Sequence, residues 1–255
     1  MEINYAGFIP ISTVDWSGRS VATIFLRGCP FNCLYCQNRE FIHGETLVDI
    51  SEIEKQILDA KPFISAIVIS GGEPLAQDIA VMWLANYAKS LGLAVGVHTN
   101  GYYPDAVRFL IKENLIDKFF IDVKAPPTNP ALYGYVAGYS QVGGRVAVMK
   151  RIIEKIKETI QIVDTAQIEF ELRTTIVKDV MWTKYDVSMT AAWIENYFGS
   201  YVPYVLQQGN PEHCEKKVNI ITRDDMIELA EVASAYLRNV RIRTQERGEE
   251  KVDFR

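Results

Sequence analysis

The feature that most constrains the fold of this chain is a repeated alternation of short apolar runs with helix-like segments. Runs such as Ala66–Ser70 and Ala94–Thr99 are continuously apolar, which is typical of parallel strands buried on both faces. Segments such as Ile79–Leu91 place apolar residues at helical spacing. Strands and helices that alternate in this way predict an α/β protein with a mostly parallel sheet covered by helices.

The predicted elements follow one another along most of the chain. Strands are predicted at Ala22–Leu26, Ala66–Ser70, Ala94–Thr99, Lys118–Val123, Gln167–Ile176 and Tyr204–Gln208. Helices are predicted at Ser51–Ala60, Ile79–Leu91, Pro104–Glu113, Arg145–Ile160, Asp186–Phe198 and Asp224–Leu237. Roughly six strand–helix units suit a partial (β/α)6 TIM-like barrel, an open version of the eightfold barrel. A doubly wound open sheet is the alternative, because periodicity alone does not separate the two.

Residues at the helix ends help to define the bounds of three predicted helices. Ser51 and Glu54 have capping-box spacing, which predicts that Ser51 begins the first helix. Gly92 is a natural terminator for the second helix, and Thr222 is the expected N-cap of the last.

The chain is expected to form one domain. Its 255 residues, 48% of them hydrophobic, suffice for one sizeable core, and no linker or low-complexity segment divides them. We expect residues 1–255 to be a single domain, with a barrel core at 18–237 and a charged C-terminal tail at 238–255.

Composition and charge exclude several classes of function. The net charge of −5 provides no global basic field, so neither a nucleic acid nor an anionic membrane is an expected partner. No apolar run is long enough to span a bilayer; even Val81–Leu91 is broken by Asn86 and Lys89. Met1–Asp15 has neither a charged leader nor an apolar core of a signal peptide. These features predict a soluble, cytoplasmic protein.

Unusual segments gather where the predicted strands end. In parallel α/β folds, chemistry is located at the carboxyl ends of the strands. The segments that follow the strands are the cysteine loop after Leu26, Gly71–Pro74, His98–Gly101, Asp122–Pro126, Arg173–Thr175 and Gln207–Asn210. Their common position predicts one composite site.

Three of the four cysteines, Cys29, Cys33 and Cys36, form a C-x3-C-x2-C cluster, and Cys214 lies far along the chain. Thiolates on a tight loop can face one iron–sulfur cubane, and three ligands leave one iron open for chemistry. The alternative is a structural zinc site that adds Cys214 or His213, because structural zinc requires four protein ligands.

The cysteine spacing, with Tyr35 before the last cysteine, resembles the signature of the radical S-adenosylmethionine (SAM) superfamily. The resemblance implies a [4Fe–4S] cluster on Cys29, Cys33 and Cys36, whose open iron binds SAM. It also implies reductive cleavage of SAM to methionine and a 5′-deoxyadenosyl radical that abstracts hydrogen. Tyr35 joins the expected cofactor-binding residues.

Two further strand ends resemble segments of the same superfamily. Gly71, Gly72, Glu73 and Pro74 resemble its second signature, whose backbone binds the SAM amino group. Thr99 and Asn100 belong to a His-Thr-Asn-Gly segment similar to the Asp-Thr-Asn-Gly of pyruvate formate-lyase activating enzymes, which lines the SAM pocket. His98 takes the place of the aspartate, and we assign it no catalytic role.

Charged strand ends complete the expected site. Asp122 and Lys124 are two residues apart and therefore point to the same side of a strand, which resembles the Asp-Leu-Lys of the same family. They are expected to contact SAM, with a strand-end ion pair as the alternative. Arg173 matches a family arginine that reaches the SAM carboxylate, a group that arginine can bind with two hydrogen bonds. The alternative is a fixed structural guanidinium.

Longer segments resemble the anaerobic ribonucleoside-triphosphate reductase activating proteins. These are Gly7–Trp16, Gly72–Leu75, Arg173–Thr175 and Tyr204–Gln208, and the similarity extends to about Leu237. It implies hydrogen abstraction from a glycine of a partner glycyl-radical enzyme. Since the chain has no second cysteine cluster, flavodoxin or ferredoxin is expected to supply the electron. Gln37 departs from the Cys-His-Asn common in activases.

Two other functions stay open at this point. One is a radical SAM enzyme that acts on a small molecule or nucleotide in the manner of 7-carboxy-7-deazaguanine synthase, which needs no partner protein. The other is a zinc-stabilised binding module, which would be colourless.

Overall fold

The computed structural model of the chain describes residues 1–139, 145–210, 212, 214 and 219–252. Its contacts divide into two compact units, each assembled from separate segments of the chain. Unit 1 comprises Met1–Pro30, Asn38–Phe120 and Glu158–Phe170, and unit 2 comprises Phe31–Gln37, Ile121–Lys157 and Glu171–Arg255. His213, an alternative zinc ligand, lies outside the described residues.

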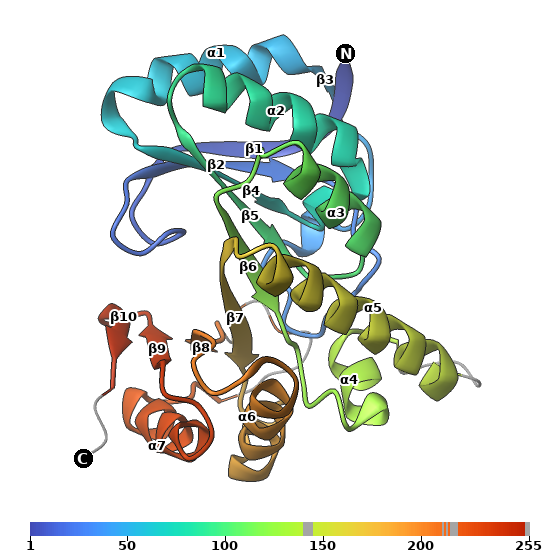
Figure 1. Cartoon of the computed structure of the whole chain (residues 1–255), viewed down its shortest axis with the longest axis vertical. Coiled ribbons are helices and arrows are strands. Elements are labelled where there is room, and N and C mark those ends of the chain that lie inside the picture. The colour runs from blue at the N-terminus through green and yellow to red at the C-terminus, as the bar shows by residue number, and fades with distance from the viewer. Residues whose placement is uncertain (140–144, 211, 213, 215–218, 253–255) are drawn as a thin grey trace. The chain divides into compact units, whose positions relative to one another are not determined.

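Unit 1 is built on a sheet whose strands lie in the order β6-β5-β4-β2-β1-β3 (Figure 1). The strands are β1 (Glu2–Ser12), β2 (Val21–Leu26), β3 (Leu47–Asp49), β4 (Ala66–Gly71), β5 (Ala94–Thr99) and the first residues of β6 (Lys118–Asp122). β2, β4 and β5 are parallel, whereas β1 is antiparallel to both β2 and β3. The parallel strands are almost completely buried, as their continuous apolar character predicts.

The helices of unit 1 are α1 (Ile50–Ala60), α2 (Asp78–Ser90), α3 (Pro104–Lys112) and the end of α5 (Arg145–Thr165).

The predicted cap of the first helix is wrong. Asp49 is the N-cap residue, and its carboxylate accepts a hydrogen bond from the Ser51 N–H. Ser51 is therefore the second residue of the helix, and its own N–H is one of the orphan donors that the cap satisfies. Gly92 has a φ of +78°, as its predicted role as terminator of α2 requires.

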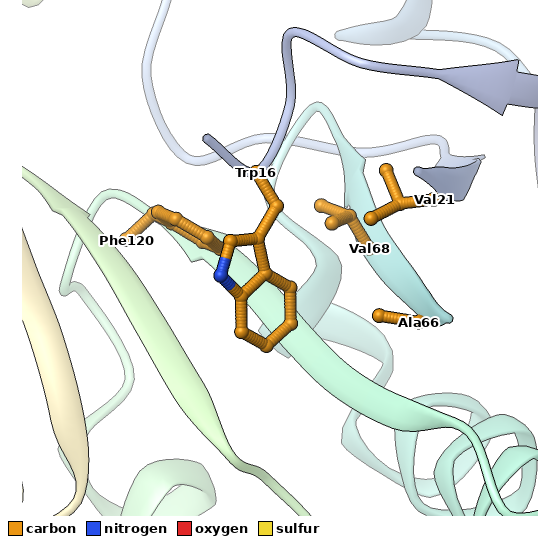
Figure 2. Close-up of a cluster of buried hydrophobic side chains, with 5 residues drawn as sticks. All are labelled: Trp16, Val21, Ala66, Val68 and Phe120. Atoms are coloured by element: carbon orange, nitrogen blue, oxygen red, sulfur yellow. The ribbon is translucent and has the colours of Figure 1, made fainter. Parts of the chain in front are cut away.

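A tryptophan from the β1–β2 loop covers part of the unit 1 sheet. Trp16 is buried against Val21, Ala66 and Val68, which share one face of β2 and β4 (Figure 2). Its ring meets Phe120 edge to face, with the centroids 5.5 Å apart. Gly96 leaves room for both rings, since a Cβ there would lie 2.9 Å from Phe120 and 3.0 Å from Trp16. Trp16 and Phe120 therefore close this part of the sheet face by packing.

Unit 2 carries the strand order β10-β9-β8-β7-β6. Its strands are the end of β6, β7 (Glu169–Ile176) from Glu171 onward, β8 (Tyr204–Gln208), β9 (Val240–Thr244) and β10 (Gly248–Lys251). β7, β8 and β9 are parallel, and β10 returns antiparallel to β9 (Figure 1). Helices α4 (Pro130–Val136), α6 (Lys184–Phe198), α7 (Arg223–Ser234) and the first part of α5 complete the unit. α7 packs on β8, β9 and α6.

The charged tail predicted at 238–255 contains two strands of the sheet. In β9, the buried residues Val240, Ile242 and Thr244 alternate with Arg241 and Arg243. The sequence did not predict this strand, because its two arginines alternate with the buried residues. Both arginines form ion pairs with Glu249 of β10, at 3.0 Å from Arg241 and 2.5 Å from Arg243.

Most predicted elements are confirmed. β5 and β8 have the predicted bounds, α5 runs five residues further than predicted, and Thr222 caps α7 in a complete capping box. β1, β3 and α4 were not predicted. The α/β class with a mostly parallel sheet is confirmed, and no pairing between the edge strands β3 and β10 closes the sheet in the described residues. The single domain stays a prediction. Over the same residues, no helix combines the length and apolarity needed to cross a bilayer.

Candidate active site

The cysteine motif is divided between the two units. Cys29 follows β2 in unit 1, whereas Cys33 and Cys36 belong to unit 2. All four cysteines, Cys214 included, are thiols rather than disulfides. Within the described residues, no group of three or more His, Cys, Asp or Glu side chains is arranged to hold a metal ion. The joint ligation by three cysteines therefore stays a prediction from their spacing.

In unit 2, the cysteine segment rests on α4. The N–H groups of Asn32 and Leu34 donate to the carbonyls of Ala137 and Val136, at 3.1 and 3.2 Å. Gly138 allows this contact, because a Cβ at its position would lie 1.9 Å from the Asn32 carbonyl oxygen and its φ is +78°. Neither α4 nor Gly138 was assigned to the site from the sequence. The only sequence signal is a glycine shortly after a short helical segment, and glycines in loops give the same signal.

The first thiol of unit 2 is buried beside a lysine. Cys36 N–H donates to the Cys33 carbonyl at 3.1 Å and turns the segment back on itself. Burial raises the pKa of the Cys33 thiol to about 11, although the nearby Lys124 ammonium acts in the opposite direction. Cys33 is thus held as a neutral thiol, and ligation of a metal would have to displace its proton.

The Tyr35 hydroxyl is an orphaned polar group. Tyr35 is buried, and its hydroxyl is the only buried side-chain N or O atom without a hydrogen-bond partner in the described part of the chain. Burial raises the pKa of the phenol well above its usual value, so the group is a neutral donor and acceptor. Since an unpaired buried hydroxyl costs about 1–3 kcal/mol, its presence suits a ligand that would pair with it.

The predicted charged pair at the end of β6 is formed. Lys124 Nζ lies 2.9 Å from the Asp122 carboxylate, and the Lys124 N–H donates to the Tyr133 hydroxyl at 3.2 Å. Burial lowers the pKa of Lys124, but Asp122 and the neighbouring Cys33 and Tyr35 outweigh it, so the net pKa is raised. The strand-end ion pair is therefore present, and contact of the pair with SAM stays a prediction.

In unit 1, the two glycines of the second motif hold two strand ends together. A Cβ on Gly71 would lie 2.1 Å from the Leu26 carbonyl oxygen, and one on Gly72 would lie 2.4 Å from the Gly28 carbonyl oxygen. Gly72 N–H donates to Leu26 O at 2.9 Å, and Glu73 N–H donates to Gly28 O at 2.7 Å. The glycines are thus required by the close approach of the β4 and β2 ends. Because these N–H groups are used, the backbone groups of this loop that suit a ligand are its carbonyl oxygens, although those of Gly71 and Glu73 already accept from Asn38 Nδ2 and Ala76 N–H.

Glu73 joins the second and third motifs. It is fully buried at the end of β4, and its carboxylate accepts hydrogen bonds from Thr99 Oγ1 at 2.9 Å and from Asn100 N–H at 2.7 Å. It also accepts from Leu75 N–H at 3.1 Å and begins the short helical turn Pro74–Gln77. Glu73 and Thr99 are therefore positioning residues in the structure. Their contact with a cofactor stays a prediction.

Two asparagines hold the strand ends next to Cys29. Asn100 Nδ2 lies 3.7 Å from Cys29 Sγ, so its amide N–H points at the first cysteine of the motif. Asn38, for which the sequence suggested no role, donates from Nδ2 to the Gly71 carbonyl at 2.9 Å. The position of Asn38 two residues after Cys36 was the only sequence signal for it.

His98 occupies the sheet face next to Trp16. Its Nε2 lies 3.2 Å from the Asp15 carbonyl oxygen, and its Nδ1 lies 3.3 Å from Ser70 Oγ. A carbonyl only accepts, so Nε2 carries a proton. The ring also meets Phe120 edge to face. In the described structure, His98 thus makes structural contacts with Asp15, Ser70 and Phe120.

Arg173 is buried in a network of charges on β7, β9 and β10. Its Nε donates to Glu171 at 2.7 Å, and both side chains are nearly inaccessible to solvent. Arg243 lies 3.9 Å from Glu171 and also contacts Gln207 and Glu249. Burial lowers the pKa of Arg173, which nevertheless remains a cation at neutral pH. Glu171 thus fixes the Arg173 guanidinium, as the alternative of a structural role requires. Contact of Arg173 with SAM stays a prediction.

The residues present fit the group that the motif implies. Three thiols on one segment are the donor set of an iron–sulfur cluster with one open iron, and thiolates suit iron better than harder metals. In unit 2, the orphaned Tyr35 hydroxyl suits a polar ligand; in unit 1, carbonyl oxygens of the Gly72–Glu73 segment are of the kind that accept from an ammonium group. Cys214 lies apart in the sequence, and its Sγ contacts the Asn210 carbonyl at 3.7 Å.

Fold and motif together describe an α/β protein with cysteines at the carboxyl end of its first parallel strand. The sequence profile of the Radical SAM superfamily matches residues 23–178. The chain belongs to the Radical SAM superfamily.

Relatives and a solved structure are similar to this chain. A Methanocaldococcus jannaschii protein is 33% identical over 249 residues, which are 96% of this chain and 97% of that protein; its name gives it provisionally as a glycyl-radical enzyme activating enzyme. A Synechocystis 7-carboxy-7-deazaguanine synthase is 34% identical over only 91 residues, 35% of this chain and 42% of that enzyme. A radical SAM methyltransferase structure from Sphaerobacter thermophilus aligns with a TM-score of 0.65 at 16% identity, over 89% of this chain and 67% of that one. The last likeness confirms the fold alone.

Proposed function

We propose that this radical SAM enzyme is an activase that abstracts a hydrogen atom from a glycine of a partner glycyl-radical enzyme. The observation that carries the proposal is the similarity to the M. jannaschii protein over 96% of the chain. Similarity of that extent reaches well beyond residues 23–178, which the superfamily profile matches. The 7-carboxy-7-deazaguanine synthases match about a third of the chain, so the small-molecule reaction is the second candidate.

In this proposal, Cys29, Cys33 and Cys36 hold a [4Fe–4S] cluster. When bound, the cluster and SAM supply a 5′-deoxyadenosyl radical. The protein's own residues position these groups: the Gly72–Glu73 carbonyls accept from an ammonium group, and the Tyr35 hydroxyl gains the partner it lacks. Asp122 and Lys124 provide fixed charges at the end of β6, and Arg173 provides one within β7. A flavodoxin or ferredoxin delivers the electron.

The experiment uses the reconstituted protein with the glycyl-radical enzyme encoded in the same genome. That enzyme is produced with deuterated glycine, mixed with SAM and reductant under anaerobic conditions, and analysed by electron paramagnetic resonance. The proposal predicts a glycyl-radical signal and one deuterium in the 5′-deoxyadenosine formed. The matched controls are Cys36→Ala, which should abolish both, and Cys214→Ala, which should leave both unchanged.

The competing functions give other outcomes. If 5′-deoxyadenosine formation rose with the substrate of 7-carboxy-7-deazaguanine synthase and no glycyl radical appeared, the small-molecule function would replace the activase. A protein that bound zinc in place of the cluster would support the binding module.

A further inference from the structure

The side-chain amide of Asn100 lies against the first cysteine of the motif. Its Nδ2 is 3.7 Å from Cys29 Sγ, within the range of an N–H···S hydrogen bond. Asn100 is buried, with 4% of its surface exposed, so water competes little for this donor. Both residues belong to unit 1.

The orientation of this amide is fixed by its other atoms. Asn100 Oδ1 accepts a hydrogen bond from Tyr102 N–H at 3.0 Å, which leaves Nδ2 as the atom that faces sulfur. The Asn100 backbone N–H is held by Glu73 at 2.7 Å. Thr159 Oγ1 donates to the Gly101 carbonyl at 2.9 Å and so also fixes the turn formed by Asn100, Gly101 and Tyr102. The donor is therefore held in place before any ligand binds.

A donor aimed at a cysteine sulfur affects the electronics of a bound cluster. Hydrogen bonds to the sulfurs are among the factors that set the potential of an iron–sulfur cluster. An N–H group withdraws electron density from the thiolate and stabilises the state with more negative charge, which is the reduced state.

We propose that Asn100 raises the reduction potential of the cluster through its hydrogen bond to Cys29 Sγ. This inference rests on the proposed function, because it needs the cluster to be present. It assigns Asn100 a role distinct from the SAM contact expected from the sequence: the residue makes the one-electron reduction easier for the external donor. Asn100 acts through Cys29 and is a positioning residue rather than a catalytic one.

Variants of Asn100 separate the hydrogen bond from the turn that holds it. Asn100→Asp keeps an oxygen for Tyr102 N–H and removes the N–H donor, whereas Asn100→Ala removes both groups. Thr159→Val is the matched control, because it removes the hydrogen bond to Gly101 and leaves the Asn100 amide in place.

The measurement is a redox titration of each reconstituted holoprotein without SAM, followed by electron paramagnetic resonance. At a fixed applied potential, we expect both Asn100 variants to hold at least about tenfold less reduced cluster relative to oxidised cluster than the unmodified protein. This is a fall in potential of about 59 mV for one electron. Thr159→Val should keep the potential of the unmodified protein.

An unchanged potential in Asn100 variants that carry a full cluster would overturn the inference and leave the proposed function intact. Equal shifts in Thr159→Val and the Asn100 variants would assign the effect to the turn and also overturn it. If neither Asn100 variant assembled a cluster while Thr159→Val did, Asn100 would serve assembly rather than tuning. An unmodified protein without a cluster would contradict the proposed function itself.

Discussion

The carboxylate of Glu73, at the end of β4, accepts the backbone N–H of Asn100, at the end of β5, at a distance of 2.7 Å. This buried hydrogen bond joins two motifs that are separate in the sequence, and a third residue, Thr99, donates to the same carboxylate. The buried carboxylate of Glu73 thus fixes the relative positions of the β4 end and the β5 end.

Glu73→Gln is expected to weaken this junction. The glutamine keeps the shape but presents an NH2 group to donors that need an acceptor, so the free energy of unfolding should fall by about 1–3 kcal/mol. Urea unfolding of the apo-protein measures the loss. Glu113→Gln, at an exposed position after α3, should stay within about 0.5 kcal/mol of the unmodified protein. Equal stability of the two variants would contradict the role of Glu73.

Gly138→Ala is expected to disrupt the support of the cysteine segment. The new Cβ would meet the Asn32 carbonyl, and alanine is strained at the positive φ, so stability should fall by at least about 2 kcal/mol. Iron content after reconstitution should fall as well. Gly134→Ala, in α4, is the matched control: its Cβ meets Met149 at an ordinary 3.8 Å, and the helix should gain up to about 1 kcal/mol. Normal iron content in Gly138→Ala would remove α4 from the site.

Alkylation of Cys33 in the folded apo-protein should have an unusual dependence on pH. Because burial raises the pKa of this thiol to about 11, the reactive thiolate fraction should rise about tenfold per pH unit from pH 8 to 10. The unfolded protein loses its proton first, so the same shift costs stability between about pH 9 and pH 11; below pH 9 both states are protonated. Peptide mapping after iodoacetamide treatment gives the rate. A rate that levels off near pH 9 would contradict the buried environment.

Arg173→Ala should destabilise the chain more than the double replacement of Arg173 and Glu171 by leucine. The single variant leaves the Glu171 carboxylate buried without its 2.7 Å partner, a loss of about 3–5 kcal/mol, whereas the double variant removes both charges. Differential scanning calorimetry compares them. SAM binding by the holoprotein tests the second role: an affinity that falls in the double variant, and falls less in Arg173→Lys, which keeps the charge but not the paired hydrogen bonds, would support contact with the carboxylate. Unchanged affinity in both would remove Arg173 from the SAM site.

The sequence predicted those elements whose structure depends on residues that are close together in the chain. Ala94–Thr99 and Tyr204–Gln208 are strands with the predicted bounds because their apolar runs are buried on both faces. The cysteine spacing predicts an iron–sulfur segment because thiolates on a tight loop can face one cluster, and joint ligation by the three thiols stays a prediction. Thr222 was identified as a cap because its capping box is a local motif.

Other features depend on contacts between distant residues. The support of the cysteine segment by Gly138 joins positions 106 residues apart in sequence, from Asn32 to Gly138, and no local pattern encodes it. β9 was missed because its arginines resemble a solvated tail until Glu249 is placed beside them. Glu73 was expected to contribute to a ligand site through its loop, and only the structure reveals that its carboxylate points toward Thr99 and Asn100.

The central claim is tested most directly by anaerobic reconstitution with iron and sulfide, followed by reduction in the presence of SAM and assay of 5′-deoxyadenosine. The account predicts a brown protein with about four iron atoms per chain that forms 5′-deoxyadenosine. It also predicts that Cys29→Ala, Cys33→Ala and Cys36→Ala lose both properties and that Cys214→Ala keeps both. A colourless protein that holds zinc and forms no 5′-deoxyadenosine, or loss of the cluster in Cys214→Ala, would contradict it.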